Sequence, residues 1–158
     1  MPKKQTLKKQ IYLILHDIRS AWNVGSMFRT ADGAGIDKIY LTGYTATPEH
    51  PKVLKTSLGA EGFVLWERYK PLGKLIKKLQ KDGIQVLALE QHPKSKNIFK
   101  YKPKYPIALV VGNEIRGVVK TTLAKVDDIL EIPMHGQKEN LNVAVAAGIA
   151  LYAIRKKK

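Results

Sequence analysis

The stretch that decides the fold reads Ile132-Pro133-Met134-His135-Gly136-Gln137-Lys138-Glu139-Asn140-Leu141-Asn142-Val143-Ala144-Val145-Ala146-Ala147-Gly148. A strand-like run ends at the proline, a polar loop follows, and the chain then enters a helix-compatible segment of Ala, Val and Gly. Asn is a strong helix N-cap because its side-chain oxygen accepts a free backbone N–H. Small residues let the helix approach its neighbours closely. The pattern predicts a polar loop held at the start of a tightly packed helix, which is a good place to hold a ligand.

Two more polar clusters follow apolar runs. Asn23-Val24-Gly25-Ser26-Met27-Phe28-Arg29-Thr30-Ala31 comes after the run at 11–15, and Gly112-Asn113-Glu114-Ile115-Arg116-Gly117 comes after the run at 107–111. Together with the C-terminal loop, their order and spacing resemble the three motifs of the SpoU-type (TrmH-like) RNA 2′-O-ribose methyltransferase family of the SPOUT superfamily. The resemblance extends from about Ile11 to Tyr152. No single motif is decisive, but three in this order are specific.

Short, nearly all-apolar runs recur along the chain, as buried parallel strands require. They lie at 11–15, 39–41, 64–66, 84–89, 107–111 and 129–132, with helix-compatible stretches at 25–34, 72–81, 118–125 and 142–155. We therefore predict an α/β fold with a mostly parallel sheet and helices on both faces. The segments 42–51 and 94–106 are predicted to be loops. The resemblance adds a C-terminal trefoil knot, an expectation that rests on the family alone because knots are otherwise almost absent from proteins.

One apolar stripe marks the last predicted helix, formed by Leu141, Val145, Ile149 and Tyr152 at spacings of four, four and three. The resemblance implies that this helix contributes to a homodimer contact. The run Ala146-Ala147-Gly148 is expected to permit close packing there.

Length and composition suit one globular domain. With 158 residues, 44% apolar and 26% charged, the chain can bury roughly 70% of the surface that its unfolded form exposes. It has no cysteine, which excludes disulfides and thiolate metal sites and fits a reducing cytosol. The four His residues lack a metal-ligand spacing, and no apolar run is long enough to cross a membrane. We expect a cytoplasmic protein without metal, consisting of one methyltransferase domain over 1–158 and no additional RNA-binding domain.

The net charge of +15 points to a polyanionic partner, because cationic side chains release the counterions that surround nucleic acid. Lys and Arg concentrate at 3–9, 74–81, 94–104 and 155–158. For any one of these clusters the alternative remains open that it is a solvated surface serving solubility.

The resemblance implies S-adenosylmethionine as the methyl donor and a ribose 2′-hydroxyl of tRNA or rRNA as the acceptor. It assigns the donor to loops that follow the last strands, with backbone groups holding it and apolar side chains enclosing the adenine. The residues so implicated are Leu89, Glu90, Gly112, Ile132, Met134 and Leu141. Ile132 and Leu141 can equally be core residues, and both roles are compatible.

The resemblance assigns catalytic roles to residues of all three motifs. Asn23 is expected to cap a helix that starts near Gly25 and to orient Arg29 or the RNA. Arg29 is the family's usual candidate for the general base, but a guanidinium is a donor that stays protonated in proteins. We therefore favour Arg29 as a fixed cation that stabilises the developing alkoxide and can also grip a phosphate.

The other catalytic candidates come from the second and third motifs. Glu114 follows a buried strand closely, and carboxylates are seldom buried without a partner, so it is expected to bond to neighbouring motif residues. Asn142 matches the Asn of the family's Ser-Leu-Asn signature. Asn140 stands where the family has Ser, which removes any role that requires a hydroxyl while leaving an amide that can donate and accept.

Competing interpretations are weaker. Gly33-Ala34-Gly35 follows a predicted helix and lacks a third Gly, so it is no dinucleotide fingerprint. A phosphate-binding loop would need Lys-Ser/Thr where Val118-Val119 follows Gly117. The main alternative is a non-catalytic RNA-binding or ribosome-assembly module that retains the fold. The joint presence of the catalytic candidates favours the enzyme.

Overall fold

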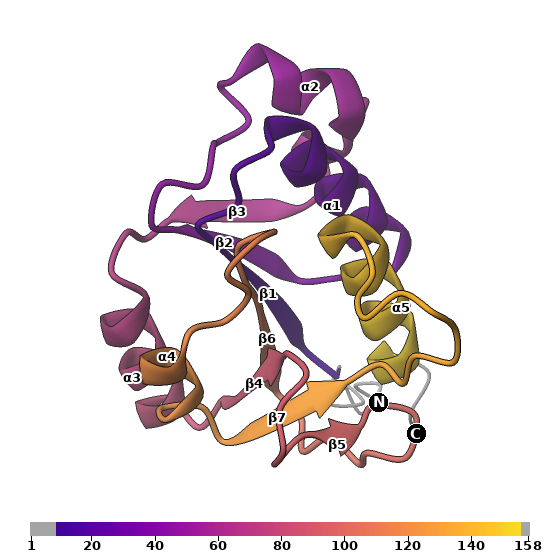
Figure 1. The fold of residues 1–158 in the computed structure, drawn as a ribbon. Coiled ribbons are helices and arrows are strands. Elements are labelled where there is room, and N and C mark those ends of the chain that lie inside the picture. Colours follow the sequence, from indigo (N-terminus) through magenta and orange to yellow (C-terminus); the bar gives the residue numbers. More distant parts are fainter. Residues whose placement is uncertain (1–8, 156–158) are drawn as a thin grey trace, which may run out of the picture.

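The computed structural model describes residues 9–155 and is built around a seven-stranded sheet (Figure 1). The strands are β1 (Ile11–His16), β2 (Lys38–Thr42), β3 (Leu65–Arg68), β4 (Gln85–Leu89), β5 (Lys96–Asn97), β6 (Ile107–Val111) and β7 (Asp128–Glu131). Their order across the sheet is β3-β2-β1-β6-β4-β7-β5, and every neighbouring pair is parallel. The predicted parallel sheet is confirmed, and each predicted apolar run coincides with a strand to within a few residues.

The helices are α1 (Ala21–Gly33), α2 (Pro51–Ser57), α3 (Leu72–Lys81), α4 (Lys120–Leu123) and α5 (Val143–Arg155), with a 3₁₀ turn at Ala60–Gly62. Helix α3 has the predicted bounds, whereas α2 and the short β5 were not predicted. Helix α2 is short and depends on local chemistry rather than on apolar periodicity. Pro51 occupies its first turn, and the His50 side chain accepts a hydrogen bond from the Lys52 amide.

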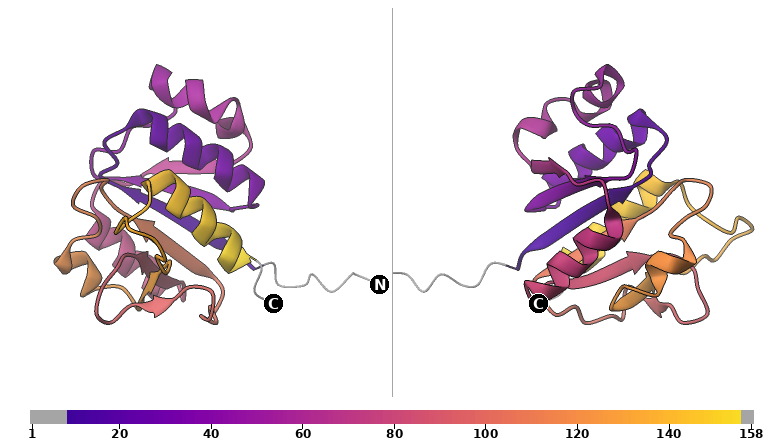
Figure 2. Two further views of the ribbon diagram at one scale, coloured as in Figure 1. Left: turned by 45° about the vertical axis from the view of Figure 1, so that its right-hand side comes forward. Right: turned by 90° about the vertical axis from the view of Figure 1, so that its left-hand side faces the viewer.

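Helices cover both faces of the sheet, as predicted (Figures 1 and 2). Alternate residues of one strand point to opposite faces. Accordingly Leu13 and Leu15 join the cluster that includes α1 and α5, while Ile14 joins the cluster beneath α3. The strands are therefore apolar on both sides, which explains why they appear in the sequence as continuous apolar runs.

Helix α1 begins earlier than predicted, and its N-cap is Ser20 rather than Asn23. The Ser20 side chain accepts the backbone N–H of Asn23 at 3.2 Å. The expectation that Asn23 caps this helix is therefore wrong, because a better-placed hydroxyl lies three residues upstream. The amide of Asn23 is left available for another partner.

Helix α5 turns a face of both small and large apolar residues inward. Its buried side chains are Ala147, Ala150, Leu151 and Ile154. Three residues of the predicted apolar stripe face outward, with Val145 52%, Ile149 36% and Tyr152 54% exposed. A Cβ atom on Gly148 would lie 3.3 Å from the Thr30 methyl group of α1, so the predicted close packing of this helix is present within the chain.

The end of α5 is clamped to the start of the described chain. The Arg155 guanidinium donates to the carbonyl oxygens of Lys9 at 2.9 Å and Ala34 at 3.0 Å, and also to that of Gly35. Because α5 starts at the carboxyl edge of the sheet, it returns the chain to the amino edge, where β1 begins. Residues 3–8 and 156–158 of the predicted basic clusters lie outside the described residues.

Candidate functional site

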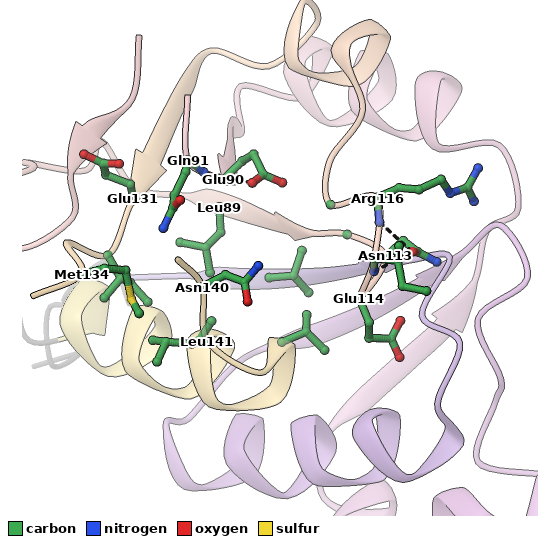
Figure 3. A pocket seen from close by; sticks show the side chains of 17 residues that line it. Leu89, Glu90, Gln91, Asn113, Glu114, Arg116, Glu131, Met134, Asn140 and Leu141 are labelled. Carbon is green, nitrogen blue, oxygen red and sulfur yellow. Dashed lines mark hydrogen bonds between the residues drawn. The ribbon is translucent and has the colours of Figure 1, made fainter. Parts of the chain in front are cut away.

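Three loops enclose a pocket at the carboxyl ends of β4, β6 and β7 (Figure 3). Crevices at this edge are where open parallel sheets bind ligands. The pocket is lined by residues 89–91 after β4, by residues 111–117 around the end of β6, and by Glu131, Ile132, Met134, Asn140, Leu141, Val143 and Ala146 between β7 and the first turns of α5. Three segments that are distant in the sequence thus meet at one place, two of them carrying motifs singled out from the sequence.

The residues predicted to hold a cofactor share this pocket. All six line it, namely Leu89, Glu90, Gly112, Ile132, Met134 and Leu141. Of the five catalytic candidates, Glu114 and Asn140 line it as well, whereas Asn23, Arg29 and Asn142 do not. The structure therefore brings together the donor-side residues and separates Arg29 from them.

Glu114 joins the second motif to the first. Its carboxylate accepts the backbone N–H groups of Arg19 and Ser20, both at 2.8 Å, and the Asn23 amide at 3.1 Å. Burial raises the pKa of Glu114, but these hydrogen bonds outweigh burial and leave the pKa below its usual value. Glu114 thus bonds to neighbouring motif residues as predicted, and an ionised carboxylate fixes the first turn of α1 against the pocket wall.

Glu90 holds the second motif from the other side. Its carboxylate accepts the Val118 amide at 2.8 Å and the Gln91 amide at 3.0 Å. Gly117 has a φ of 64°, and a Cβ there would lie 2.0 Å from the Glu90 carboxylate. Glycine is therefore required at this turn. The Glu90 carboxylate already accepts hydrogen bonds within the protein, so mainly the backbone of Glu90 is left to contact a ligand.

Asn113 is the most important residue that sequence reasoning missed. It is buried, and its amide nitrogen donates to the Asp17 carbonyl at 2.9 Å and the Tyr44 hydroxyl at 2.8 Å. Its oxygen accepts the Ile115 and Arg116 amides. Its place inside the second motif was the available sequence signal. Sequence position alone, however, does not distinguish a side chain that organises a loop from one that binds a ligand.

The pocket contains three carboxylates and one cation among its lining side chains: Glu90, Glu114, Glu131 and Arg116. The guanidinium of Arg116 lies 3.7 Å from Asp17, whose other carboxylate oxygen accepts the Tyr44 amide. The carboxylates of Glu90 and Glu114 are satisfied by backbone donors, as described above. Glu131 and Arg116 therefore carry the charges that remain most open to a ligand.

The predicted Asn cap of α5 is Asn142, a choice between Asn140 and Asn142 that the sequence had left open. Its side-chain oxygen accepts the Ala144 amide at 2.8 Å and the Val145 amide at 3.2 Å. Asn140 lies two residues earlier on the same loop, and its side chain is among those that line the pocket (Figure 3). The loop and the helix start thus adopt the arrangement predicted from the sequence.

Arg29 lies on the exposed side of α1, outside the pocket lining. Within residues 9–155 its side chain has no hydrogen-bond or ion-pair partner. Asn23 bonds to Glu114 and not to Arg29. No direct contact between Asn23 and Arg29 in the described residues therefore supports the expectation that Asn23 orients Arg29.

Among the described residues, no group of His, Asp or Glu side chains is arranged to hold a metal ion. The same part of the chain contains no helix that is both long and apolar enough to cross a membrane.

The sequence is similar to those of named bacterial RNA methyltransferases. RlmP of Bacillus subtilis, a 23S rRNA (guanosine(2553)-2′-O)-methyltransferase, is 34% identical over 157 residues, which is 98% of this chain and 62% of the relative. RlmB of Vibrio parahaemolyticus, a 23S rRNA (guanosine-2′-O-)-methyltransferase, is 32% identical over 148 residues, 93% of this chain and 60% of the relative. The chain thus spans about three fifths of the length of these curated relatives.

Solved structures show the same fold. The AdoMet-bound rRNA methyltransferase of Sinorhizobium meliloti matches with a TM-score of 0.85 and 27% identity, covering 93% of this chain and 56% of that one. The TrmH/SpoU tRNA modifying enzyme of A. aeolicus matches with a TM-score of 0.85 and 26% identity, covering 95% and 76%. The model of the SpoU rRNA Methylase family matches residues 10–152, which include all three motifs and the whole pocket, and the chain therefore belongs to this family.

Proposed function

We propose that the protein transfers a methyl group from S-adenosylmethionine to a ribose 2′-hydroxyl in tRNA or rRNA. The observation that carries this proposal is the pocket formed by three converging loops, with Glu114 joining it to the first motif. The relatives are named as methyltransferases of this type, but the chain spans only part of their length. Activity and substrate are therefore proposed for this chain on the basis of its own site.

The chemistry of the pocket fits the donor. Leu89, Ile132, Met134 and Leu141 supply apolar surface for an adenine ring, and Glu131 supplies a carboxylate for a hydroxyl or an ammonium group. The loop containing Gly112 offers backbone donors and acceptors beside them. Held there, S-adenosylmethionine would supply an electrophilic methyl carbon to the ribose 2′-oxygen, and the neutral thioether S-adenosylhomocysteine would be the leaving group.

For the acceptor hydroxyl we propose electrostatic stabilisation by a cation rather than proton removal by a general base. We assign Arg29 to stabilise the alkoxide that develops on the 2′-oxygen, since a guanidinium donates hydrogen bonds but does not accept a proton at neutral pH. The proton then leaves to phosphate or water. Arg29 lies outside the lining of this chain's own pocket, so this role requires its guanidinium to reach the pocket mouth when RNA or a second copy of the chain is bound. Asn23, Asn140 and Asn142 are assigned to orient the acceptor and the loop that closes over the donor.

We also propose a homodimer in which the outer face of α5 contributes to the contact. Its support is the stripe formed by Val145, Ile149 and Tyr152, three apolar side chains that remain exposed on one helix. The sequence had suggested Ala147 for this contact. Ala147 is 0% exposed within the chain, so it serves the core instead. Sedimentation of the purified protein at micromolar concentration tests the dimer, and a monomer under these conditions would contradict it.

Three further assignments follow from membership of the family. We propose that the segment following β7 forms the family's trefoil knot, supported by α5 packing on α1 rather than beside β7. We propose that the basic surface of this methyltransferase domain contributes to RNA binding. We also place the protein in the cytoplasm, where tRNA and rRNA are found.

Mass-spectrometric mapping of ribose methylation in tRNA and rRNA, with and without the gene, tests the proposal. The expected result is the loss of a 2′-O-methyl site that returns with the wild-type gene and not with an Arg29→Ala variant. Calorimetry on the purified protein should show binding of S-adenosylmethionine without added metal. An unchanged methylation map together with absent donor binding, with RNA also present, would favour a non-catalytic RNA-binding module.

A further inference from the structure

Trp22 is an exposed aromatic side chain on a rigidly held backbone. Its side chain lies in the first turn of α1, and the residue is 44% exposed. Its carbonyl oxygen accepts the Thr56 hydroxyl of α2 at 2.9 Å. The next residue, Asn23, donates to Glu114 in the pocket wall. The backbone is thus fixed from two sides, at the edge of the pocket, while much of the indole remains accessible.

Trp22 shares the outer face of α1 with Arg29. The two residues are seven apart, which is close to two helical turns, so their side chains lie on one side and about 10 Å apart along the axis. One flank of this face is closed by α2, because a Cβ on Gly25 would lie 1.9 Å from the Thr56 hydroxyl. The other flank is closed by α5 at the contact between Thr30 and Gly148. Trp22 and Arg29 therefore form a ridge between two helices.

The surroundings of this ridge are basic. The Lys55 ammonium lies 5.8 Å from the centre of a Trp22 ring, and Lys52, Arg19 and Arg29 are all exposed nearby in α2 or α1 or just before α1. Single exposed apolar side chains are common and need no explanation. A rigid aromatic ring flanked by cations is different, because it combines the two features that bind single-stranded nucleic acid: a stacking surface for a base and positive charge for the backbone.

We propose that Trp22 stacks on a base of the RNA next to the nucleotide to be methylated, while Lys55 and Arg29 contact phosphates on either side. This inference rests on the proposed function and deepens it by naming a positioning residue for the acceptor strand. Stacking accepts any base, so Trp22 sets where the strand lies rather than which sequence is bound. A ridge of this kind directs a single-stranded or looped region towards the pocket, rather than a regular duplex whose bases are already stacked.

The chain has two tryptophans, which allows a direct test. In a Trp66→Phe variant the intrinsic fluorescence reports on Trp22 alone. The probes are a short single-stranded RNA of mixed sequence and an abasic RNA of equal length and charge, with bulk tRNA as a third. Fluorescence lifetimes are measured, because they are insensitive to light absorption by the RNA. We expect RNA with bases to shorten the Trp22 lifetime and abasic RNA to leave it unchanged.

Affinity measurements complete the test. Trp22→Ala should weaken binding of the mixed-sequence RNA by about 5-fold to 150-fold, the range typical of one stacked base. Trp22→Phe should recover most of this loss and Trp22→Leu little of it. Affinity for S-adenosylmethionine should be unchanged in all three variants, because Trp22 does not line the pocket. Equal lifetimes with both RNAs, or equal affinity for Trp22→Ala and wild type, would overturn the inference.

The remaining outcomes are also decisive. If Trp22 emission changes with protein concentration in the absence of RNA, a second copy of the chain covers the indole and the stacking role is wrong. If ribose methylation proceeds normally in Trp22→Ala at limiting RNA, the inference fails while the proposed function stands. If wild-type protein binds neither S-adenosylmethionine nor RNA, both fail together.

Discussion

The wall of the pocket and the outer face of α1 and α5 lie close together, yet they differ in how far their side chains are bonded within the chain. In the wall, Glu114 and Asn113 direct their hydrogen bonds to partners within the chain. On the outer face, Arg29, Val145 and Tyr152 are exposed. One chain is sufficient to form the wall, whereas the side chains of the outer face are left exposed, where we propose that RNA and a second copy of the chain bind.

This difference separates variants that change the fold from variants that change recognition. A substitution in the wall or beneath α5 removes contacts that exist in the isolated chain, and it should alter stability first. A substitution on the outer face removes nothing from the isolated chain, and it should alter turnover, association or RNA affinity at constant stability. The following variants test whether the two regions separate in this way.

The largest effect is expected for Ala147→Glu. Ala147 is 0% exposed beneath α5, so a carboxylate there would be buried without a partner and should cost at least 4 kcal/mol, about enough to unfold a marginally stable domain. The matched control is Val145→Glu on the exposed side of the same helix, which should remain folded. Circular dichroism distinguishes the two, and sedimentation should show the Val145→Glu protein dissociated into monomers. A folded Ala147→Glu protein would contradict the assignment of this face to the core.

The next effect is expected for Arg29→Ala, which should lower the rate of methyl transfer by about 10²–10³-fold, the range for removing one donor to a developing oxyanion. Melting temperature and S-adenosylmethionine affinity should stay at wild-type values, because Arg29 is exposed and outside the pocket. Arg29→Lys should also be poor, since a single ammonium cannot reproduce the planar guanidinium. Near-normal turnover in Arg29→Lys would show that the planar shape of the guanidinium is not needed. A large loss of S-adenosylmethionine affinity in Arg29→Ala would contradict the assignment of Arg29 to the acceptor rather than to the donor.

A smaller effect, on stability, is expected for Glu114→Gln. Weakening hydrogen bonds to a charged acceptor should cost about 1.5–3 kcal/mol at pH 7, measured by urea unfolding. The pKa of Glu114 is lowered in the folded protein, so its stabilisation is fully present above the ordinary carboxyl pKa and is lost as pH falls through the folded value. The difference between wild type and variant should therefore be constant from pH 6 to 7 and shrink below about pH 4.5. Glu49→Gln, at an exposed loop position, is the control and should be neutral.

The smallest effect concerns the basic surface away from both regions. Neutralising Lys77, Lys78 and Lys81, which are exposed on α3, tests whether this cluster contacts RNA. Each lost phosphate contact should reduce the slope of log affinity against log salt by about 0.7. The comparison triple is Lys156, Lys157 and Lys158, which directly follow α5 in the sequence. An unchanged slope in both triples would mean that these clusters serve solubility.

What could be predicted from the sequence follows the same division. The strands were predictable because both faces of the sheet are buried, which makes them continuous apolar runs. The pocket-lining positions of Gly112, Met134 and Leu141 came from the family resemblance, which assigns the donor to the loops after the last strands. The capping of α1 was not, since Ser20 and Asn23 are both good N-caps and only the position of Glu114 decides between them. The outward direction of the α5 stripe was also missed, because periodicity identifies an apolar face without showing which face meets the core.

The clamp formed by Arg155 has a practical consequence for anything attached to this protein. Lys9 and Arg155 are joined by a hydrogen bond at the amino edge of the sheet, whereas the pocket opens at the carboxyl edge. A fluorophore, affinity tag or surface tether placed just beyond either end of the described chain would therefore depart from the same corner, on the side away from the loops. Immobilised protein should keep its pocket accessible whichever end is used, and a linker between the two ends could be short enough for a circular permutation.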